Sequence, residues 1–238
     1  MPNIIVIGMV WDTFKDGIDA VLHPEHVRVT KMSVGDSLAM YYKFSVIPLV
    51  LLAIVALGAG FLLQGVLAAT GLLNGVIGGS VALLAVAGVV VYVWGIVPIG
   101  LLVFSVIVHW IGKGLDTFKG DYGATFNAAV YGMFGPLAVL WLSVLPVIGG
   151  LIQLIAFIWS IYVLVVVLGL QHKTTRIHTL VVLVAAGVAV WLITQLVAGW
   201  VTLGLLGLVV GPLVGAVAGA LATVGHVTLP AAVGGGVA

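Results

Sequence analysis

The amino-acid sequence predicts an all-α fold, a polytopic transmembrane helical bundle of about five or six spans with a short amphipathic N-terminal region. Three observations support this fold class. Of the 238 residues, 63% are hydrophobic and only 6% are charged, whereas about a quarter of the residues in a soluble domain are charged. The mean hydropathy is +1.37. The apolar runs are long and continuous, whereas the strands of a membrane barrel alternate polar and apolar residues.

The charge balance and the residue types narrow the classes of function. The net charge is +1, so nothing in the composition indicates a nucleic-acid partner. The chain has no cysteine, which excludes disulfides, thiolate metal sites and thiol chemistry. The first apolar run, residues 4–10, is too short for a cleavable signal peptide and has no basic region before it, so we expect targeting to rely on the first span.

Residues 1–43 form the predicted cytoplasmic N-terminal segment. Trp11, Phe14 and Ile18 recur at helical spacing with aspartates between them, which predicts an amphipathic helix. Such a helix can lie in the membrane interface, and the alternative is that it packs on loops of the same protein. His23-Pro24-Glu25 ends it, and a second short helix over residues 33–42 leads to the bilayer, with Tyr41 and its neighbours expected at the lipid boundary.

Residues 44–200 form the predicted five-span domain. Span one covers residues 44–67, with Pro48 in its first turn, and a glycine-rich external loop follows at 68–80. Span two, residues 81–111, is longer than a bilayer needs, so we expect a tilt, or a kink at 94–98 caused by Pro98; two half-spans are the alternative. The remaining spans are expected at residues 130–147, 151–170 and 179–200, with a tight turn at 148–150 between the first two of these.

Residues 201–238 form a glycine-rich apolar extension and a tail. The stretch 201–224 is either a sixth span or an element that packs against a neighbour. Its glycines recur four residues apart, a spacing that lets helix backbones approach closely. The predicted helix-association site is therefore Gly207, Gly211, Gly215 and Gly219. Its partner is another helix of the same chain, a second copy or another subunit.

The distribution of basic residues predicts the topology. All 8 lie in three segments: the N-terminal region, the loop after span two and the loop after span four. Short loops rich in lysine and arginine stay in the cytoplasm. The pattern predicts a multi-pass protein of the cell membrane with a cytoplasmic N-terminus. The loop residues expected to contact lipid headgroups are Lys113, Lys119, Lys173 and Arg176.

Several of these segments together resemble the Yip family, the Ypt/Rab-interacting multi-span membrane proteins, in its prokaryotic form. They are the N-terminal segment from Trp11 to His26, the loop 113–126, the stretch 129–136 entering span three, and Trp159-Ser160 in span four. The resemblance implies five spans and a cytoplasmic N-terminus. Eukaryotic members are implicated in vesicle traffic, GTPase binding and membrane shaping, whereas prokaryotic relatives lack an assigned activity. The N-terminal region here is short, and the apolar extension after residue 200 departs from the family pattern.

No catalytic, cofactor-binding or metal-binding residues are predicted. No Asp, Glu, Lys or Arg lies in the middle of a predicted span, which argues against a coupled transporter or pump. His109 could be a metal or haem ligand or a pH sensor, but an interfacial role is favoured. His23, Glu25 and His26 match no known metal-ligand spacing, and the loop with His172 and His178 is interpreted as a basic membrane-facing loop.

The function that these features favour is an integral membrane scaffold or organising protein, not an enzyme. It would act through helix–helix association and through contact with the cytoplasmic membrane surface, as a homo-oligomer or as a subunit of a membrane complex. Trp11, Phe14 and Ile18 are the residues expected to insert into the interface. The alternative is a passive channel or small-solute transporter, for which Gln153 and Ser160, on one helix face, offer a candidate polar track. An intramembrane enzyme is the third alternative.

Overall fold

The computed structural model describes residues 2–27, 32–69, 77–145 and 147–195. The chain divides into two compact units, residues 1–188 and 189–238. The regular structure in the described ranges is helical. Within those ranges, four helices are long and apolar enough to cross a membrane, namely Val34–Leu62, Leu83–Gly114, Ile148–His172 and Arg176–Gln195. The span expected at residues 130–147 is not among them, because a helix of 17 residues ends at Ala138 and a 3-10 helix follows at Leu140–Val144.

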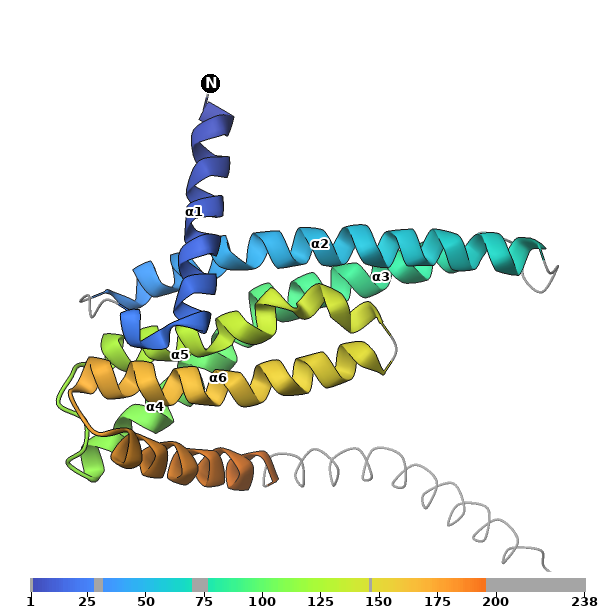
Figure 1. Cartoon of the computed structure of the whole chain (residues 1–238). Coiled ribbons are helices and arrows are strands. Elements are labelled where there is room, and N and C mark those ends of the chain that lie inside the picture. Colours follow the sequence, from blue (N-terminus) through green and yellow to red (C-terminus); the bar gives the residue numbers. More distant parts are fainter. Residues whose placement is uncertain (1, 28–31, 70–76, 146, 196–238) are drawn as a thin grey trace, which may run out of the picture. The chain divides into compact units, whose positions relative to one another are not determined.

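The first unit begins with two helices that meet at a steep angle (Figure 1). Helix α1 (Pro2–Leu22) ends before the short 3-10 turn η1 (Pro24–His26), and α2 runs over Val34–Ala69. Ser33 and Asp36 start α2 with a reciprocal capping box, because the Ser33 hydroxyl accepts the Asp36 N–H at 3.1 Å and the Asp36 carboxylate accepts the Ser33 N–H at 3.2 Å.

Helix α2 differs from the prediction in this region. The expected short helix at 33–42 and span one at 44–67 are one continuous helix, because no residue between them breaks it. Pro48 therefore lies inside α2 instead of in its first turn. Tyr41, which was expected at the lipid boundary, is fully buried.

The predicted kink in span two is a π-helical turn. Helix α3 (Ile77–Val91) passes through η2 (Tyr92–Ile96) into α4 (Val97–Gly114). In a π-helix the Val93 carbonyl would accept an N–H from residue 98, and Pro98 has none. The Tyr41 hydroxyl of α2 donates to this carbonyl at 2.7 Å, so the group that Pro98 leaves without a donor is paired from another helix.

The second half of the unit is a helical hairpin followed by one more helix. Helix α5 (Tyr122–Ala138) leads through η3 (Leu140–Val144) to α6 (Ile148–His172), and the helix Arg176–Gln195 follows. The tight turn expected at 148–150 lies earlier in the chain, since α6 already begins at Ile148. Helix α5 lies in the interior, and its residues Thr125 to Val130 are all buried.

Two apolar clusters hold these helices together. In the first, α2 and α5 contribute the fully buried rings of Tyr41, Phe44, Phe126 and Phe134. The second lies among α4, α5, α6 and the helix that follows, around Val108, Val163, Leu168 and Val182. Burying an apolar side chain of this size contributes about 1.5–3 kcal/mol.

In the first unit, the segment after α4 approaches the end of α6 and the residue just before α2. The Gly120 N–H, in the segment after α4, donates to Nδ1 of His172, the last residue of α6, at 3.0 Å. Near the same place, a Cβ added to Gly123 would lie 2.9 Å from the carbonyl oxygen of Met32, just before α2. The charge pattern requires this proximity if the three segments share one side of a membrane.

Candidate functional site

Helix α1 is attached to the bundle by a close contact at Gly17. The Phe44 ring of α2 lies directly over this residue, so that a Cβ at position 17 would collide with it. Phe44 in turn stacks on Phe14 of α1 and on Phe134 of α5, with ring centroids 5.1 and 4.1 Å apart. The absence of a side chain at Gly17 therefore sets how closely α1 approaches the core.

Trp159 attaches the C-terminal end of α1, one turn beyond Gly17. Its indole Nε1 donates to the Val21 carbonyl at 2.7 Å, which pairs one of the carbonyls left free at the end of the helix. With Gly17, this bond joins α1 to α2, α5 and α6.

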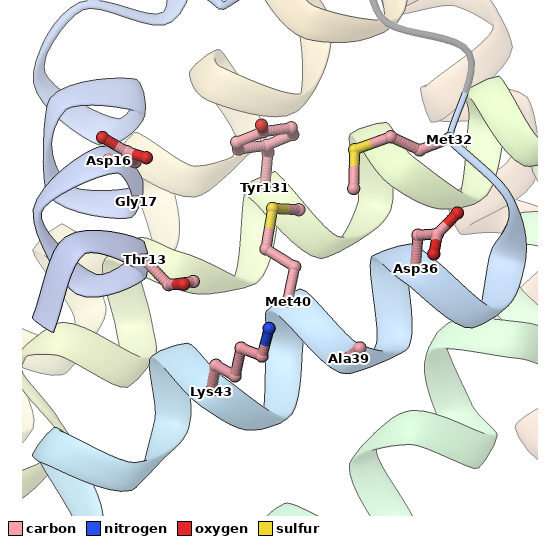
Figure 2. A pocket seen from close by; sticks show the side chains of 9 residues that line it. All are labelled: Thr13, Asp16, Gly17, Met32, Asp36, Ala39, Met40, Lys43 and Tyr131. Atoms are coloured by element: carbon pink, nitrogen blue, oxygen red, sulfur yellow. The ribbon is translucent and has the colours of Figure 1, made fainter. Parts of the chain in front are cut away.

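Beside Gly17 lies a hollow of about 310 Å³, here called the α1 hollow (Figure 2). Three helices and the segment before α2 form its walls. Carboxylates from α1 and α2, an ammonium from α2 and a phenol from α5 face it, together with two methionines. Its lining residues are Thr13, Asp16, Gly17, Met32, Asp36, Ala39, Met40, Lys43 and Tyr131.

A second hollow of about 420 Å³ adjoins the first and shares Asp16 and Tyr131 with it. Asp19 and His26 add to its polar wall. Asp16 and Tyr131 thus stand at the boundary between two polar spaces under α1.

The charged groups of the α1 hollow do not neutralise one another. Asp16 and Lys43 make no ion pair with any residue in the described ranges. Asp36 uses Oδ2 for the capping box with Ser33 and has no cationic partner there either. Lys43 is half-buried, and Asp16 and Asp36 are exposed. Unpaired charges of both signs therefore converge on one small space.

A buried amide without partners lies on the same face of α5. Asn127 precedes Tyr131 by four residues, so the two side chains leave α5 on one side, a helical turn apart. Asn127 is 1% exposed, and neither its Oδ1 nor its Nδ2 has a hydrogen-bond partner. Leaving a buried polar group unpaired costs about 1–3 kcal/mol. Asn127 therefore has unused hydrogen-bonding capacity, but it is not among the described residues that line the α1 hollow.

A separate polar cluster joins α4, α5 and α6. The Thr125 hydroxyl lies 2.9 Å from His109 Nδ1 and 2.9 Å from His172 Nε2. Phe118 stacks flat on the His172 ring, with centroids 4.0 Å apart and 6° between the planes. The His172 side chain is 1% exposed, so the cluster is shielded from solvent.

The hydrogen-bond partners define which atom carries each proton in this cluster. The Gly120 N–H can only donate, so His172 Nδ1 accepts and carries no proton. The proton of neutral His172 is then on Nε2, which donates to Thr125. The Thr125 hydroxyl is left to donate to His109 Nδ1. The chain of bonds runs in one direction, and His172 is neutral within it.

The structure places the predicted interface residues on one face of α1. They line a shallow groove of about 260 Å³, whose residues are Trp11, Phe14, Lys15, Ile18, Asp19 and Leu22. Trp11 is 48% exposed, whereas Phe14 and Ile18 are half-buried against the core. The Lys15 Nζ lies 5.4 Å from the centroid of the Trp11 ring. One face of α1 therefore both packs on the bundle and leaves Trp11 open.

The other predicted site residues fall into two groups. Lys113, Lys119, Lys173 and Arg176 are all exposed, in the segments that meet near His172. Gly207, Gly211, Gly215 and Gly219 lie outside the described residues. In the described parts of the chain, no three His, Cys, Asp or Glu side chains are grouped so that they could hold a metal ion.

The sequence analysis identified neither the α1 hollow nor the role of His172. Asp16 and Lys43 were assigned to a polar helix face and to a lipid boundary, and Tyr131 to the start of a span. These assignments treat each helix separately, whereas the hollow exists only where α1, α2 and α5 meet. His172 was interpreted as part of an exposed basic loop, but it is buried, because Gly120 and Thr125 provide polar partners for both ring nitrogens.

Comparisons of the chain with protein-family models, with curated proteins and with solved structures find no match. The resemblance to the Yip family therefore stays a prediction from the sequence.

Proposed function

We propose that this protein is an integral membrane scaffold or organising protein of the cell membrane, with a cytoplasmic N-terminus and the architecture of a prokaryotic Yip-type protein. It acts by contact with the cytoplasmic membrane surface and by helix–helix association, as a homo-oligomer or as a subunit of a complex. Its partners are membrane lipids and other membrane helices. It has no catalytic role in this proposal.

The observation that carries the proposal is the way α1 is held. This helix crosses α2 steeply (Figure 1) and is attached through Gly17 and Val21. If α2 stands upright in a bilayer, α1 lies along the surface, which is the orientation of an interfacial amphipathic helix. Trp11 stays exposed on it, and tryptophan prefers the boundary between water and hydrocarbon.

The polar groups inside the helical hairpin favour the scaffold function and argue against a channel. Gln153 Nε2 donates to the Pro136 carbonyl at 3.4 Å, and the Ser160 hydroxyl donates to the Phe157 carbonyl at 2.7 Å. Both side chains of the candidate polar track are thus engaged with backbone. A cavity of about 580 Å³ next to Ser160 has almost entirely apolar walls. The Ser160 hydroxyl is therefore paired within its own helix, beside an apolar cavity.

The depth of α1 tests the proposal directly. The chain lacks cysteine, so single spin labels can be placed by Trp11→Cys and by Asp12→Cys, at neighbouring exposed positions on different sides of α1. In lipid vesicles we expect the label at position 11 to be accessible to oxygen, which concentrates in hydrocarbon. The label at position 12 should instead be accessible to a water-soluble nickel chelate. Equal accessibility of both labels to the nickel chelate would show that α1 does not lie in the membrane interface.

A further inference from the structure

We propose that the α1 hollow binds the headgroup of an aminophospholipid, with the ammonium group near Asp16 and the phosphate near Lys43. This inference rests on the proposed function, because it requires the hollow to lie at the membrane surface. It names the lipid class that the surface contact would recognise.

The composition of the walls favours an organic ammonium group. Asp16 and Asp36 enter the hollow from α1 and α2, and Tyr131 presents a phenol between them (Figure 2). Carboxylates accept charge-assisted hydrogen bonds from a primary ammonium, and an aromatic ring attracts a cation over its face. The adjoining hollow adds Asp19, a further carboxylate on α1.

Lys43 makes the site suited to a zwitterion and not to a simple cation. Among the described residues that line the hollow, Lys43 is the only cationic one, and it comes from α2 whereas Asp16 comes from α1 (Figure 2). Ammonium and phosphate are separated by two methylene groups in phosphatidylethanolamine. Met32 and Met40 provide apolar wall next to the charged groups, which suits such a short linker. The volume of about 310 Å³ lies at the lower end of the usual range for small ligands.

The position of Lys43 along α2 places the hollow at headgroup level. The charged residues of α2 are Asp36 and Lys43, and every residue from Phe44 to Ala69 is uncharged. That apolar part, about 26 residues, spans about 39 Å at 1.5 Å per residue, enough to cross a hydrocarbon core of about 30 Å. The α2 wall of the hollow therefore ends where the apolar part begins.

The test is native mass spectrometry of the full chain from micelles that contain equal amounts of phosphatidylethanolamine, phosphatidylcholine and phosphatidylglycerol with identical acyl chains. We expect phosphatidylethanolamine to be retained preferentially. Loss of one charge-assisted hydrogen bond should weaken binding about tenfold, so Asp16→Asn and Lys43→Gln should each lower its retention by about that factor. The matched control Asp12→Asn removes an exposed charge outside the hollow and should leave retention unchanged.

The outcomes separate this inference from the proposed function. Equal retention of phosphatidylethanolamine and phosphatidylglycerol, or an equal effect of Asp16→Asn and Asp12→Asn, would overturn the headgroup site. If either occurs while the spin label at position 11 lies in hydrocarbon, the scaffold proposal stands and only the headgroup site is lost. Soluble glycerophosphoethanolamine is added as a competitor. If an equimolar amount of this soluble competitor displaced the lipid, the ligand would be a soluble phosphoamine and the lipid assignment would be overturned.

Discussion

His172 shows how one buried side chain can join three helices. Both of its ring nitrogens are used, one toward the Gly120 N–H and one toward Thr125, and Phe118 covers its face. The imidazole thereby holds the ends of α4, α5 and α6 together. A histidine can be buried at this position because each of its ring nitrogens has a hydrogen-bond partner.

We expect His172→Leu to lower the free energy of unfolding by about 3 kcal/mol, because the Gly120 N–H and the Thr125 hydroxyl would lose their common partner inside the protein. His178→Leu is the matched control, since His178 is exposed and follows on the next helix. Denaturant titration in mixed micelles measures both values. Similar losses for the two variants would show that the buried chain of hydrogen bonds contributes nothing to stability.

The sequence indicates only part of the contacts made by His109 and His172. His109 was recognised as a residue near the end of a span, and it does lie near the end of α4. Its connection to His172 was not predictable, because the two histidines are linked through Thr125 on a third helix. Spacing along one helix carries no information on such a contact.

At the scale of elements, α1 and α2 depend on one glycine for their close approach. Gly17 and Gly8 lie in the same helix, but only Gly17 faces another helix; a Cβ at Gly8 would meet nothing within 4 Å. The same substitution at the two positions therefore separates helix propensity from packing.

We expect Gly8→Ala to raise the stability of α1 by up to about 1 kcal/mol, because alanine favours the helix. Gly17→Ala gains the same propensity but pushes the Phe44 ring out of its stack with Phe134, so its net effect should be destabilising. Hydrogen exchange of the α1 amides measures the local stability of the helix. Faster exchange in Gly17→Ala and slower exchange in Gly8→Ala would confirm the docking contact, and slower exchange in both would contradict it.

Sequence patterns located some elements correctly and misplaced others. The irregular turn before Pro98 was located correctly, since a proline in a long apolar run has a local and unavoidable effect. The continuity of α2 was missed, because Tyr41 and its neighbours were interpreted as the lipid boundary between a short helix at 33–42 and span one. The turn between α5 and α6 was placed too late, at glycines that begin α6. The tertiary packing at Gly149, where a Cβ would collide with the Leu142 carbonyl, explains why glycine is needed there.

For the whole molecule, the distribution of charge requires three segments to share one side of a membrane. Two contacts fit this requirement, since Gly120 in the segment after α4 bonds to His172 at the end of α6, and Gly123 lies close to Met32 just before α2. The sequence predicts five or six spans, and the described ranges contain four helices of spanning length. The total number of spans and the association of copies stay predictions.

The association of copies is testable by native mass spectrometry of the protein in nanodiscs. We expect the wild type to be oligomeric and the double variant Gly211→Leu with Gly215→Leu to be monomeric, because leucine side chains prevent close approach of helix backbones. Gly58→Leu with Gly65→Leu is the control, since both of these glycines lie in α2 with open space around them. A wild type that is monomeric and has no companion subunit would remove the support for association.

The interior position of α5 has a consequence for how the chain enters the bilayer during synthesis. Helix α5 has 17 residues, is not among the four helices of spanning length, and buries Thr125 and Asn127. A segment of this length and polarity does not partition well from the translocon into lipid by itself. Because α6 is apolar and packs along α5, we expect the translocon to hold α5 until α6 has been synthesised, and to release the two together as a hairpin.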